Sequence, residues 1–166
     1  VVQHMPPLFT RSLAERIASR SSLRCLEGVD GALLEPGTVW IAPGNWHMTL
    51  QRDGADTRLR LSADPPENSC RPSVDPLFRT VADLYGAGAL GVILTGMGQD
   101  GLLGARRLHE RQGRIVVQDE ATSVVWGMPG AVARAGLAHR IVPLQEMSGE
   151  ILKHVSSVGR RRATVA

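Results

Sequence analysis

Apolar and polar positions along the chain follow two periods, one typical of buried strands and one typical of amphipathic helices. Short apolar runs predict strands at residues 23–27, 37–44, 89–95, 114–118 and 139–144, and residues 1–3 are predicted to end another strand. Helical periodicity predicts helices that begin at Thr10 and Ser73, with others at residues 102–111, 127–135 and around Ile151 and Val155. Because helices and strands take turns along the chain, the pattern predicts a mostly parallel sheet with helices on both faces.

Residues 47–62 depart from this order. Their sequence, HMTLQRDGADTRLRLS, alternates apolar and polar residues around Asp53-Gly54, which is typical of a β-hairpin. The expected fold class is therefore α/β, a doubly wound, mostly parallel sheet in three Rossmann-like layers, with one hairpin. The chain has 166 residues and no internal repeat, so we expect one domain over residues 1–155 and a basic, disordered tail over residues 156–166.

Composition excludes several classes of protein. Hydrophobic residues make up 43% of the chain, but no apolar run reaches the roughly 18 residues of a membrane span. The net charge of +3 is matched by three arginines at 160–162, so the folded part is neutral and no nucleic-acid partner is expected. Cys25 and Cys70 lie far apart without a metal-binding spacing, which predicts reduced thiols in a cytoplasmic protein with neither metal nor cofactor. The chain begins with Val-Val, and we expect it to be a piece of something longer that lacks the start of its domain.

The segment LTGMGQDG, residues 94–101, is a candidate functional loop. It leaves a buried strand and enters a helix, which is where ligands bind in open α/β sheets. Its three glycines allow positive φ, and backbone N–H groups near a helix N-terminus suit a developing oxyanion. Two alternatives stay open on this motif alone. Gly96-x-Gly98-x-x-Gly101 fits the pattern of a dinucleotide-binding loop, and Asp100 is suited to cap the helix that follows.

His4 is the second candidate, because it also follows a predicted strand end. The carboxyl ends of parallel strands meet at one edge of a sheet, so we expect His4 and Asp100 to approach each other there. A carboxylate that accepts from a His ring N–H fixes the tautomer and stabilises the imidazolium, as in hydrolase triads. Taken singly, a His in this place is more often a structural residue beside a turn.

Five segments together resemble the catalytic domain of the chemotaxis protein-glutamate methylesterases, in order across about residues 1–154. They are VVQHMPPLFTRSLAERI, VWIAPGNWHMTL, RPSVDPLFRTVA, GVILTGMGQDG and ATSVVWGMPGAVARAG. The resemblance implies a cytoplasmic doubly wound α/β enzyme that hydrolyses γ-glutamyl methyl esters on chemoreceptors, often deamidates receptor glutamines, and often follows a receiver domain. It implies a Ser-His-Asp triad in which His4 and Asp100 take the last two places, with Met97 and its neighbour Gly98 at the oxyanion hole.

The sequence departs from this family at the nucleophile. Family members carry it in a Gly-Ala-Ser-Thr-Gly-Gly type loop before the catalytic His, and neither that loop nor a G-x-S-x-G motif occurs here. Ser123 is nearest to the expected cleft, but nothing marks it as a nucleophile. We therefore predict that these residues alone are inactive. Two further hypotheses are a non-catalytic module that binds receptors or partners, and a nucleotide-binding protein.

Two more residues are candidates for the rim of the cleft. His47 follows IAPGNW, and Arg71 precedes Pro72-Ser73 and would suit an acidic receptor helix. Packing against Trp46 is the alternative for His47, and a solvated surface position is the alternative for Arg71. Trp126 and Met128 are expected in the core.

Overall fold

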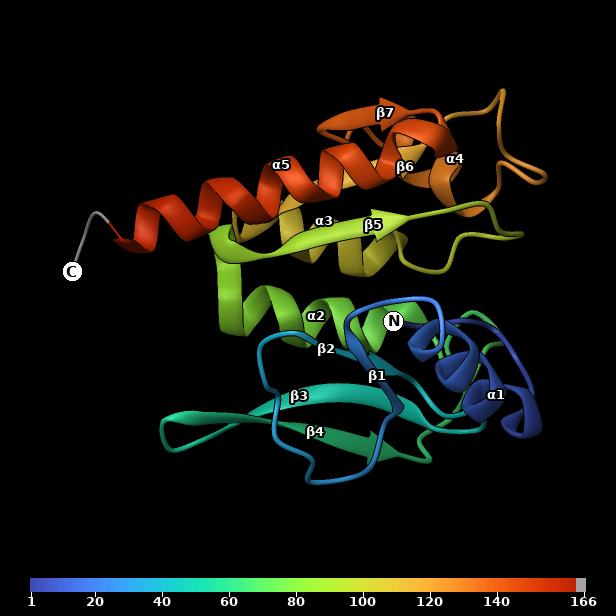
Figure 1. Cartoon of the computed structure of the whole chain (residues 1–166). Coiled ribbons are helices and arrows are strands. Elements are labelled where there is room, and N and C mark those ends of the chain that lie inside the picture. Colours follow the sequence, from blue (N-terminus) through green and yellow to red (C-terminus); the bar gives the residue numbers. More distant parts are fainter. Residues whose placement is uncertain (164–166) are drawn as a thin grey trace.

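The computed structural model describes the backbone of residues 1–163 and the side-chain surroundings of residues 1–156. Helices and strands take turns along most of this part of the chain (Figure 1). In order they are α1 (Pro7–Ala18), β1 (Arg24–Glu27), β2 (Thr38–Ile41), β3 (His47–Asp53), β4 (Asp56–Ser62), α2 (Val74–Tyr85), η1 (Gly86–Gly88), β5 (Leu90–Ile93), α3 (Leu102–Glu110), β6 (Arg114–Gln118), α4 (Met128–Arg134), β7 (Arg140–Val142) and α5 (Leu144–Ala163). The predicted α/β class is confirmed, as is the hairpin.

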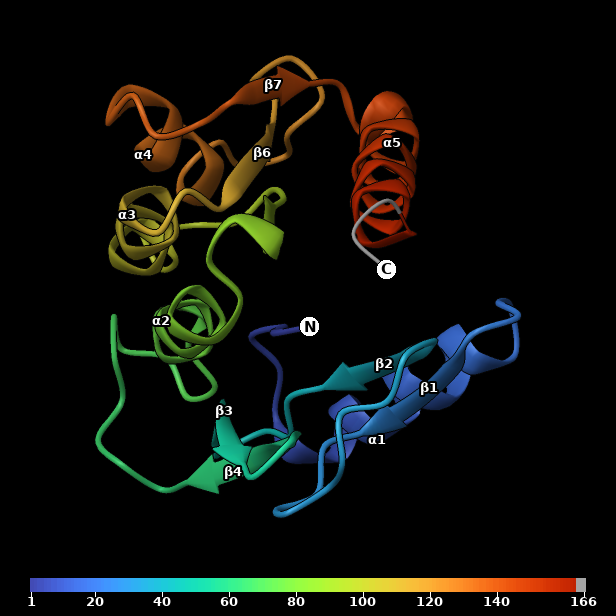
Figure 2. The same cartoon turned by 90° about the vertical axis from the view of Figure 1, so that its left-hand side faces the viewer.

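The strands of the described chain form three small sheets. β1 pairs with β2 in parallel, and β5, β6 and β7 form a second parallel sheet in that order. β3 and β4 form the antiparallel hairpin, in register from His47 opposite Ser62 to Asp53 opposite Asp56. The N-terminus lies between the two parallel sheets, close to the level of α2 (Figure 2). The parallel strands described here therefore fall into two groups where the sequence predicted one sheet.

Residues 1–3 do not form the predicted strand, but they run beside β2. The Ala42 N–H donates to the carbonyl of Val1 at 2.8 Å, and the Val1 nitrogen donates to the carbonyl of Trp40 at 2.5 Å. These two bonds are too few for a regular strand. They still place His4 near the carboxyl end of β2, as the sequence predicted.

Helix α1 begins earlier than the sequence predicted. Pro7 occupies the first turn, where its fixed φ and missing N–H are tolerated, so Thr10 is not the cap. Thr10 is instead fully buried within the helix, where its hydroxyl donates to Glu27 at 2.6 Å and accepts from the Gly44 N–H at 3.2 Å. This polar contact fixes the helix that follows His4 to β1 and to the loop after β2.

The core lies on both sides of α2. On one side, α2 packs against a cluster that contains Ile93, Leu108, Ile115 and Val132. On its other side, α2 packs against a cluster that contains the hairpin residues Met48, Leu50 and Leu59. Helix α3 crosses α2 closely at Gly104, where an added Cβ would come within 2.5 Å of the Phe78 side chain. This close crossing brings the loop before α3 onto the N-terminus of α2.

The C-terminal segment differs in part from the predicted tail. Residues 156–163 continue helix α5, and residues 164–166 lie outside the described residues. The domain boundary after residue 155 stays a prediction. None of the helices described is both long enough and apolar enough to cross a bilayer.

Candidate active site

Asp100 lies in the loop between β5 and α3, but its carboxylate sits on the N-terminus of α2. It accepts the Val74 N–H at 2.7 Å and the Asp75 N–H at 3.3 Å. The Ser73 hydroxyl, which the sequence predicted as the cap of α2, makes no cap bond and donates to Asp100 at 2.5 Å. Asp100 therefore caps α2 from another part of the chain, and its alternative role as the side-chain cap of α3 is wrong.

His4 reaches the same carboxylate. Its Nε2 lies 2.7 Å from Oδ2 of Asp100, although the two residues are 96 positions apart. The His4 side chain is 29% exposed, whereas that of Asp100 is 2% exposed. The sequence predicted this approach, and the fold produces it because residues 1–4 run beside β2 while Asp100 follows β5.

The charge of Asp100 is set by its hydrogen-bond donors. Burial opposes ionisation, but hydrogen bonds from His4, Ser73 and the Val74 and Asp75 N–H groups outweigh it and lower the pKa to about 2. The carboxylate is therefore ionised at neutral pH and accepts a hydrogen bond from the Nε2–H of His4. That tautomer leaves Nδ1 of His4 unprotonated, and no hydrogen bond to it is made by the described residues. His4 is thus oriented to accept a proton at Nδ1.

The glycine loop is held against the start of α4. The Gly96 N–H donates to the carbonyl of Val125 at 3.0 Å, and the Gly96 carbonyl accepts from the Met128 N–H at 2.8 Å. Glycine is required at 127, because an added Cβ would lie 2.6 Å from the Gly96 carbonyl and 2.8 Å from the Gly98 nitrogen. This contact fixes the backbone of the loop that ends in Asp100.

Met97 and Gly98 form the open part of this loop. Met97 is 84% exposed, and Gly98 adopts a φ of +83°, which favours glycine. Their backbone lies on the same loop as Asp100 and faces solvent. The arrangement agrees with the oxyanion position implied by the resemblance, which stays a prediction.

Gln118, at the end of β6, is a positioning residue that sequence reasoning missed. It is fully buried, accepts the Thr95 N–H at 2.8 Å and donates to the Thr122 carbonyl at 2.7 Å. Its backbone carbonyl accepts the Trp126 indole N–H at 3.0 Å. A polar residue that ends an otherwise apolar strand was the available signal.

The structure corrects the interpretation of His47. It is 2% exposed, accepts the Ser73 N–H on Nδ1 at 3.3 Å and bonds through Nε2 to the Pro65 carbonyl at 3.1 Å. Both nitrogens are thus used, and His47 lines neither of the two cavities described below. Its role is to hold residues 65–73 against the hairpin, because those bonds occupy its whole polar edge.

Arg71 lies close to the site, as predicted. Its guanidinium donates to the carbonyls of Ala63 and Asp64 at 2.7 and 3.0 Å, which holds it along the loop. Arg71 and His4 both line a cavity of about 320 Å³.

Met128 is buried in the core, which confirms the prediction for this residue.

Cys70 is a further neighbour that sequence reasoning missed. It also lines the cavity of about 320 Å³. Its thiol, one ring nitrogen of His4 and a carboxylate oxygen of Asp100 lie within 4.8 Å of one another. Burial and the negative charge of Asp100 raise the pKa of this thiol. Both cysteines are free, as predicted.

A second cavity, of about 530 Å³, lies beside β5. His4 and Gly96 are among its lining residues, and most of its remaining wall is apolar: Val1, Val2, Leu77, Phe78, Val81, Leu90, Val92, Ile93, Leu94, Leu108, Met128 and Ile151. It borders the edge of β5 that has no strand partner among the described residues. The cavity therefore has both the open edge of β5 and His4 in its wall.

No serine of the described residues is hydrogen-bonded to His4. The Ser123 hydroxyl donates to the Asp119 carbonyl at 2.6 Å. In dinucleotide-binding proteins an acidic residue about 20 positions after the glycine loop binds the ribose. Asp119 stands nearest to that place here, but its side chain accepts from the Thr122 N–H at 3.0 Å and closes a turn. These contacts support neither Ser123 as the nucleophile nor the nucleotide-binding alternative.

Comparison with known proteins assigns this arrangement to a family. The model of the CheB methylesterase family matches residues 1–151. The chain is 52% identical over 155 residues to a protein of Trichodesmium erythraeum and 53% identical over 156 residues to one of Nocardioides sp., each named protein-glutamate methylesterase/protein-glutamine glutaminase. These matches cover 93% and 94% of this chain but only 44% and 43% of the relatives, so the chain spans less than half their length.

The fold agrees with this assignment. The crystal structure of the Thermotoga maritima CheB methylesterase catalytic domain superposes with a TM-score of 0.90 at 38% identity, covering 92% of this chain and 81% of that one. The residues matched by the family model, 1–151, include all five segments that carry the resemblance. The chain belongs to the CheB methylesterase family.

Proposed function

We propose that the protein containing this chain is a protein-glutamate methylesterase that hydrolyses γ-glutamyl methyl esters on chemoreceptors. The observation that carries the proposal is the 2.7 Å contact between His4 and a buried, ionised Asp100 beside a glycine loop. The names of the relatives support both the ester substrate and deamidation of glutamine as a second reaction of the same site. An upstream receiver domain stays a prediction.

The proposed mechanism assigns one step to each group. A serine hydroxyl attacks the ester carbonyl while Nδ1 of His4 takes its proton, and the protonated ring then gives that proton to the departing methanol. Water repeats the attack on the acyl-enzyme, which frees the glutamate carboxylate and restores the serine. Asp100 stabilises the imidazolium throughout, and the backbone N–H groups around Met97 and Gly98 stabilise the tetrahedral oxyanion.

We propose further that the nucleophilic serine comes from a segment outside these 166 residues. Two observations support this: His4 Nδ1 is left without a partner among the described residues, and His4 lines the largely apolar cavity beside β5. An added strand on the open edge of β5 would fill that cavity and deliver the loop after it to Nδ1. The 166 residues alone are then expected to be inactive.

The test is methanol release from methylated receptor. The protein expressed from the complete gene should release methanol, and His4→Ala should lose about 10³-fold or more of kcat, as removal of a triad base does. His109→Ala is the matched control, because His109 is exposed on α3, away from the site. If the complete protein bound receptor but released no methanol, the non-catalytic binding module would replace this proposal.

A further inference from the structure

Cys70 is held rigidly beside the His4–Asp100 pair. Its N–H donates to the Glu67 carbonyl at 2.9 Å, and the Glu67 N–H donates back to the Cys70 carbonyl at 3.2 Å, which closes a tight loop. The Glu67 carboxylate forms a two-point ion pair with Arg79 of α2, at 2.9 and 2.5 Å. The loop that presents the thiol is therefore fixed to the helix that Asp100 caps.

The three side chains offer one ligand set. Thiolate, imidazole and carboxylate are the usual protein ligands of Zn²⁺, with bonds of about 2.0 to 2.3 Å. Ligand atoms of a tetrahedral ion then lie roughly 3.3 to 3.7 Å apart. The atoms of His4, Cys70 and Asp100 lie within 4.8 Å of one another, so side-chain adjustments of about 1 Å would close the set on an ion.

The groups around these three side chains are compatible with a bound metal ion. If His4 bound a metal in place of Asp100, the Asp100 carboxylate would still accept hydrogen bonds from the Val74 and Gly101 N–H groups, at 2.7 and 2.9 Å. Such second contacts orient a ligating carboxylate. The cavity of about 320 Å³ beside His4 and Cys70 leaves room for water in the remaining coordination position. The thiol proton would be released on binding.

We propose that His4, Cys70 and Asp100 form an open zinc site, and that Zn²⁺ bound there inhibits the proton transfer assigned to His4. The ion takes the place of the proton shared by His4 and Asp100, so metal and catalysis compete for one pair of side chains. The binding half stands on geometry alone, and only the inhibition half rests on the proposed esterase function.

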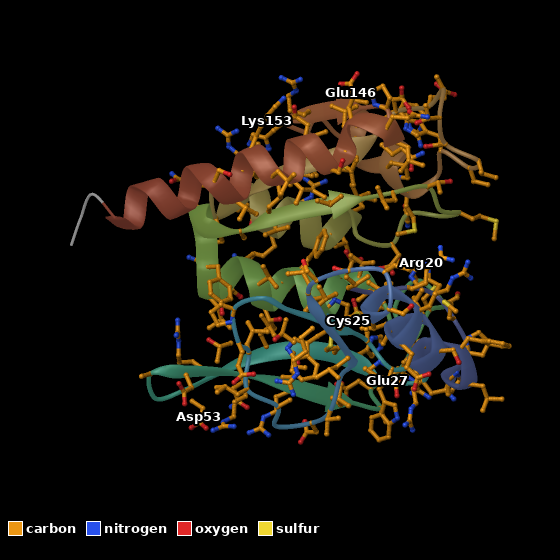
Figure 3. The ribbon with its side chains drawn as sticks, viewed as in Figure 1. Arg20, Cys25, Glu27, Asp53, Glu146 and Lys153 are labelled. Carbon is orange, nitrogen blue, oxygen red and sulfur yellow. The ribbon has the colours of Figure 1, made fainter. Side chains whose placement is uncertain are left out.

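Cys25 provides the matched control. It is also a free cysteine, but it lies on β1, beside α1 (Figure 3), where it is buried against Ala14 and Ile41. It belongs to no group of three metal-ligating side chains in the described chain. Cys25→Ser therefore removes a thiol without touching the proposed ligands.

The binding experiment uses Co²⁺ as a spectroscopic probe, with the complete protein freed of any affinity tag. Thiolate-to-cobalt charge-transfer absorption in the near ultraviolet is expected in the unaltered protein and in Cys25→Ser, and is expected to vanish in Cys70→Ser. Calorimetric titration with zinc alone should show at least about tenfold weaker binding by Cys70→Ser. Equal cobalt spectra or equal zinc affinity in Cys70→Ser would overturn the site.

The activity experiment separates the two halves. Each variant's methanol release is measured with rising zinc and compared with its own metal-free rate. Cys70→Ser should need at least about tenfold more zinc for half inhibition than Cys25→Ser. Zinc binding without inhibition would overturn the competition, whereas cobalt absorption in a protein with no esterase activity would support the site and overturn the proposed function.

Discussion

Asp75 and Asp100 are two buried carboxylates at the N-terminus of α2, yet the fold shifts their pKa values in opposite directions. Burial raises the pKa of Asp75, and its bonds from the Gly104 N–H and Asn68 are too few to reverse this. The pKa of Asp100 falls to about 2, because donors from His4, Ser73 and the first turn of α2 outweigh its burial. The Asn68 amide bonds to both carboxylates, at 2.9 and 3.1 Å.

This difference in pKa distinguishes a carboxylate that only joins two helices from one that is suited to catalysis. Asp75 ties α2 to the backbone of α3 through Gly104, at 2.6 Å, and it has no contact with His4. Among the described residues, Asp75 accepts two hydrogen bonds, whereas Asp100 accepts six, one of them from the His4 ring. Burial alone therefore does not identify a functional carboxylate. The number of donors that hold its charge does, since only a stable anion can stabilise an imidazolium.

The largest expected effect is a loss of catalytic rate when Asp100 is changed. Asp100→Asn keeps the shape of the side chain, but its amide cannot hold His4 as the Nε2–H tautomer. We expect kcat for methanol release by the complete protein to fall on the order of 10⁴-fold, by analogy with the Ser-His-Asp precedent. Circular dichroism serves as the control for folding. Near-full activity in a folded Asp100→Asn protein would contradict the triad assignment and leave Asp100 as the cap of α2.

The second effect is on stability in acid. The pKa of Asp100 is about 2 in the folded protein, against an ordinary value of 3.8, so its contribution is complete above pH 3.8 and is lost as the pH falls toward 2. The difference corresponds to about 2 kcal/mol of the free energy of unfolding. Asp75, whose pKa is raised, contributes in the opposite sense and gains as the pH falls.

Urea unfolding followed by tryptophan fluorescence, at about pH 5 and about pH 2.5, measures this contribution. The loss of stability between the two pH values should be about 2 kcal/mol smaller in Asp100→Asn than in the unaltered protein. Asp75→Asn should make the loss larger. Equal acid sensitivity in all three proteins would mean that neither carboxylate is shifted.

The third effect tests the amide that joins the two carboxylates. Asn68 has a φ of +52°, so Asn68→Gly removes its donors without straining the backbone, whereas alanine would add strain. Asp100 loses one donor and keeps the others, and we expect a roughly tenfold fall in kcat, equivalent to about 1.4 kcal/mol. A change in KM alone would show that Asn68 contacts substrate and does not position Asp100.

Much of this fold was predictable from the sequence, because its signals are local. The hairpin around Asp53-Gly54 and the strand RIVVQ follow from alternation and apolar runs. The approach of His4 and Asp100 followed from a general rule about strand ends. Residues 1–3 and the start of α1 were predicted wrongly, because residues 1–3 make only two backbone bonds beside β2, too few for a strand, and Pro7 starts the helix before Thr10.

The residues that hold and surround His4 and Asp100 were not predictable, because their roles depend on contacts between segments that are distant in sequence. Ser73 has the sequence signature of a cap, yet its hydroxyl serves Asp100, 27 positions away. His47 follows a motif that suggested a cleft, yet its polar edge is used by residues 65 and 73. Cys70 and His4 have no metal-binding spacing and meet only in the folded chain.

The smallest expected effect on kcat is that of Asp75→Asn, which completes the comparison. In Asp75→Asn the side-chain oxygen still accepts from the Gly104 N–H, while the new amide faces the Asn68 amide, so one buried contact is lost. We expect the free energy of unfolding to fall by about 1 to 3 kcal/mol. Asp100 keeps all its donors, including His4, so kcat should change by less than about threefold. Thermal unfolding and methanol release, measured on the same preparation, separate the two quantities. A fall in kcat comparable to that of Asp100→Asn would show that the charge of Asp75 also reaches His4, and the two carboxylates would then form one catalytic unit.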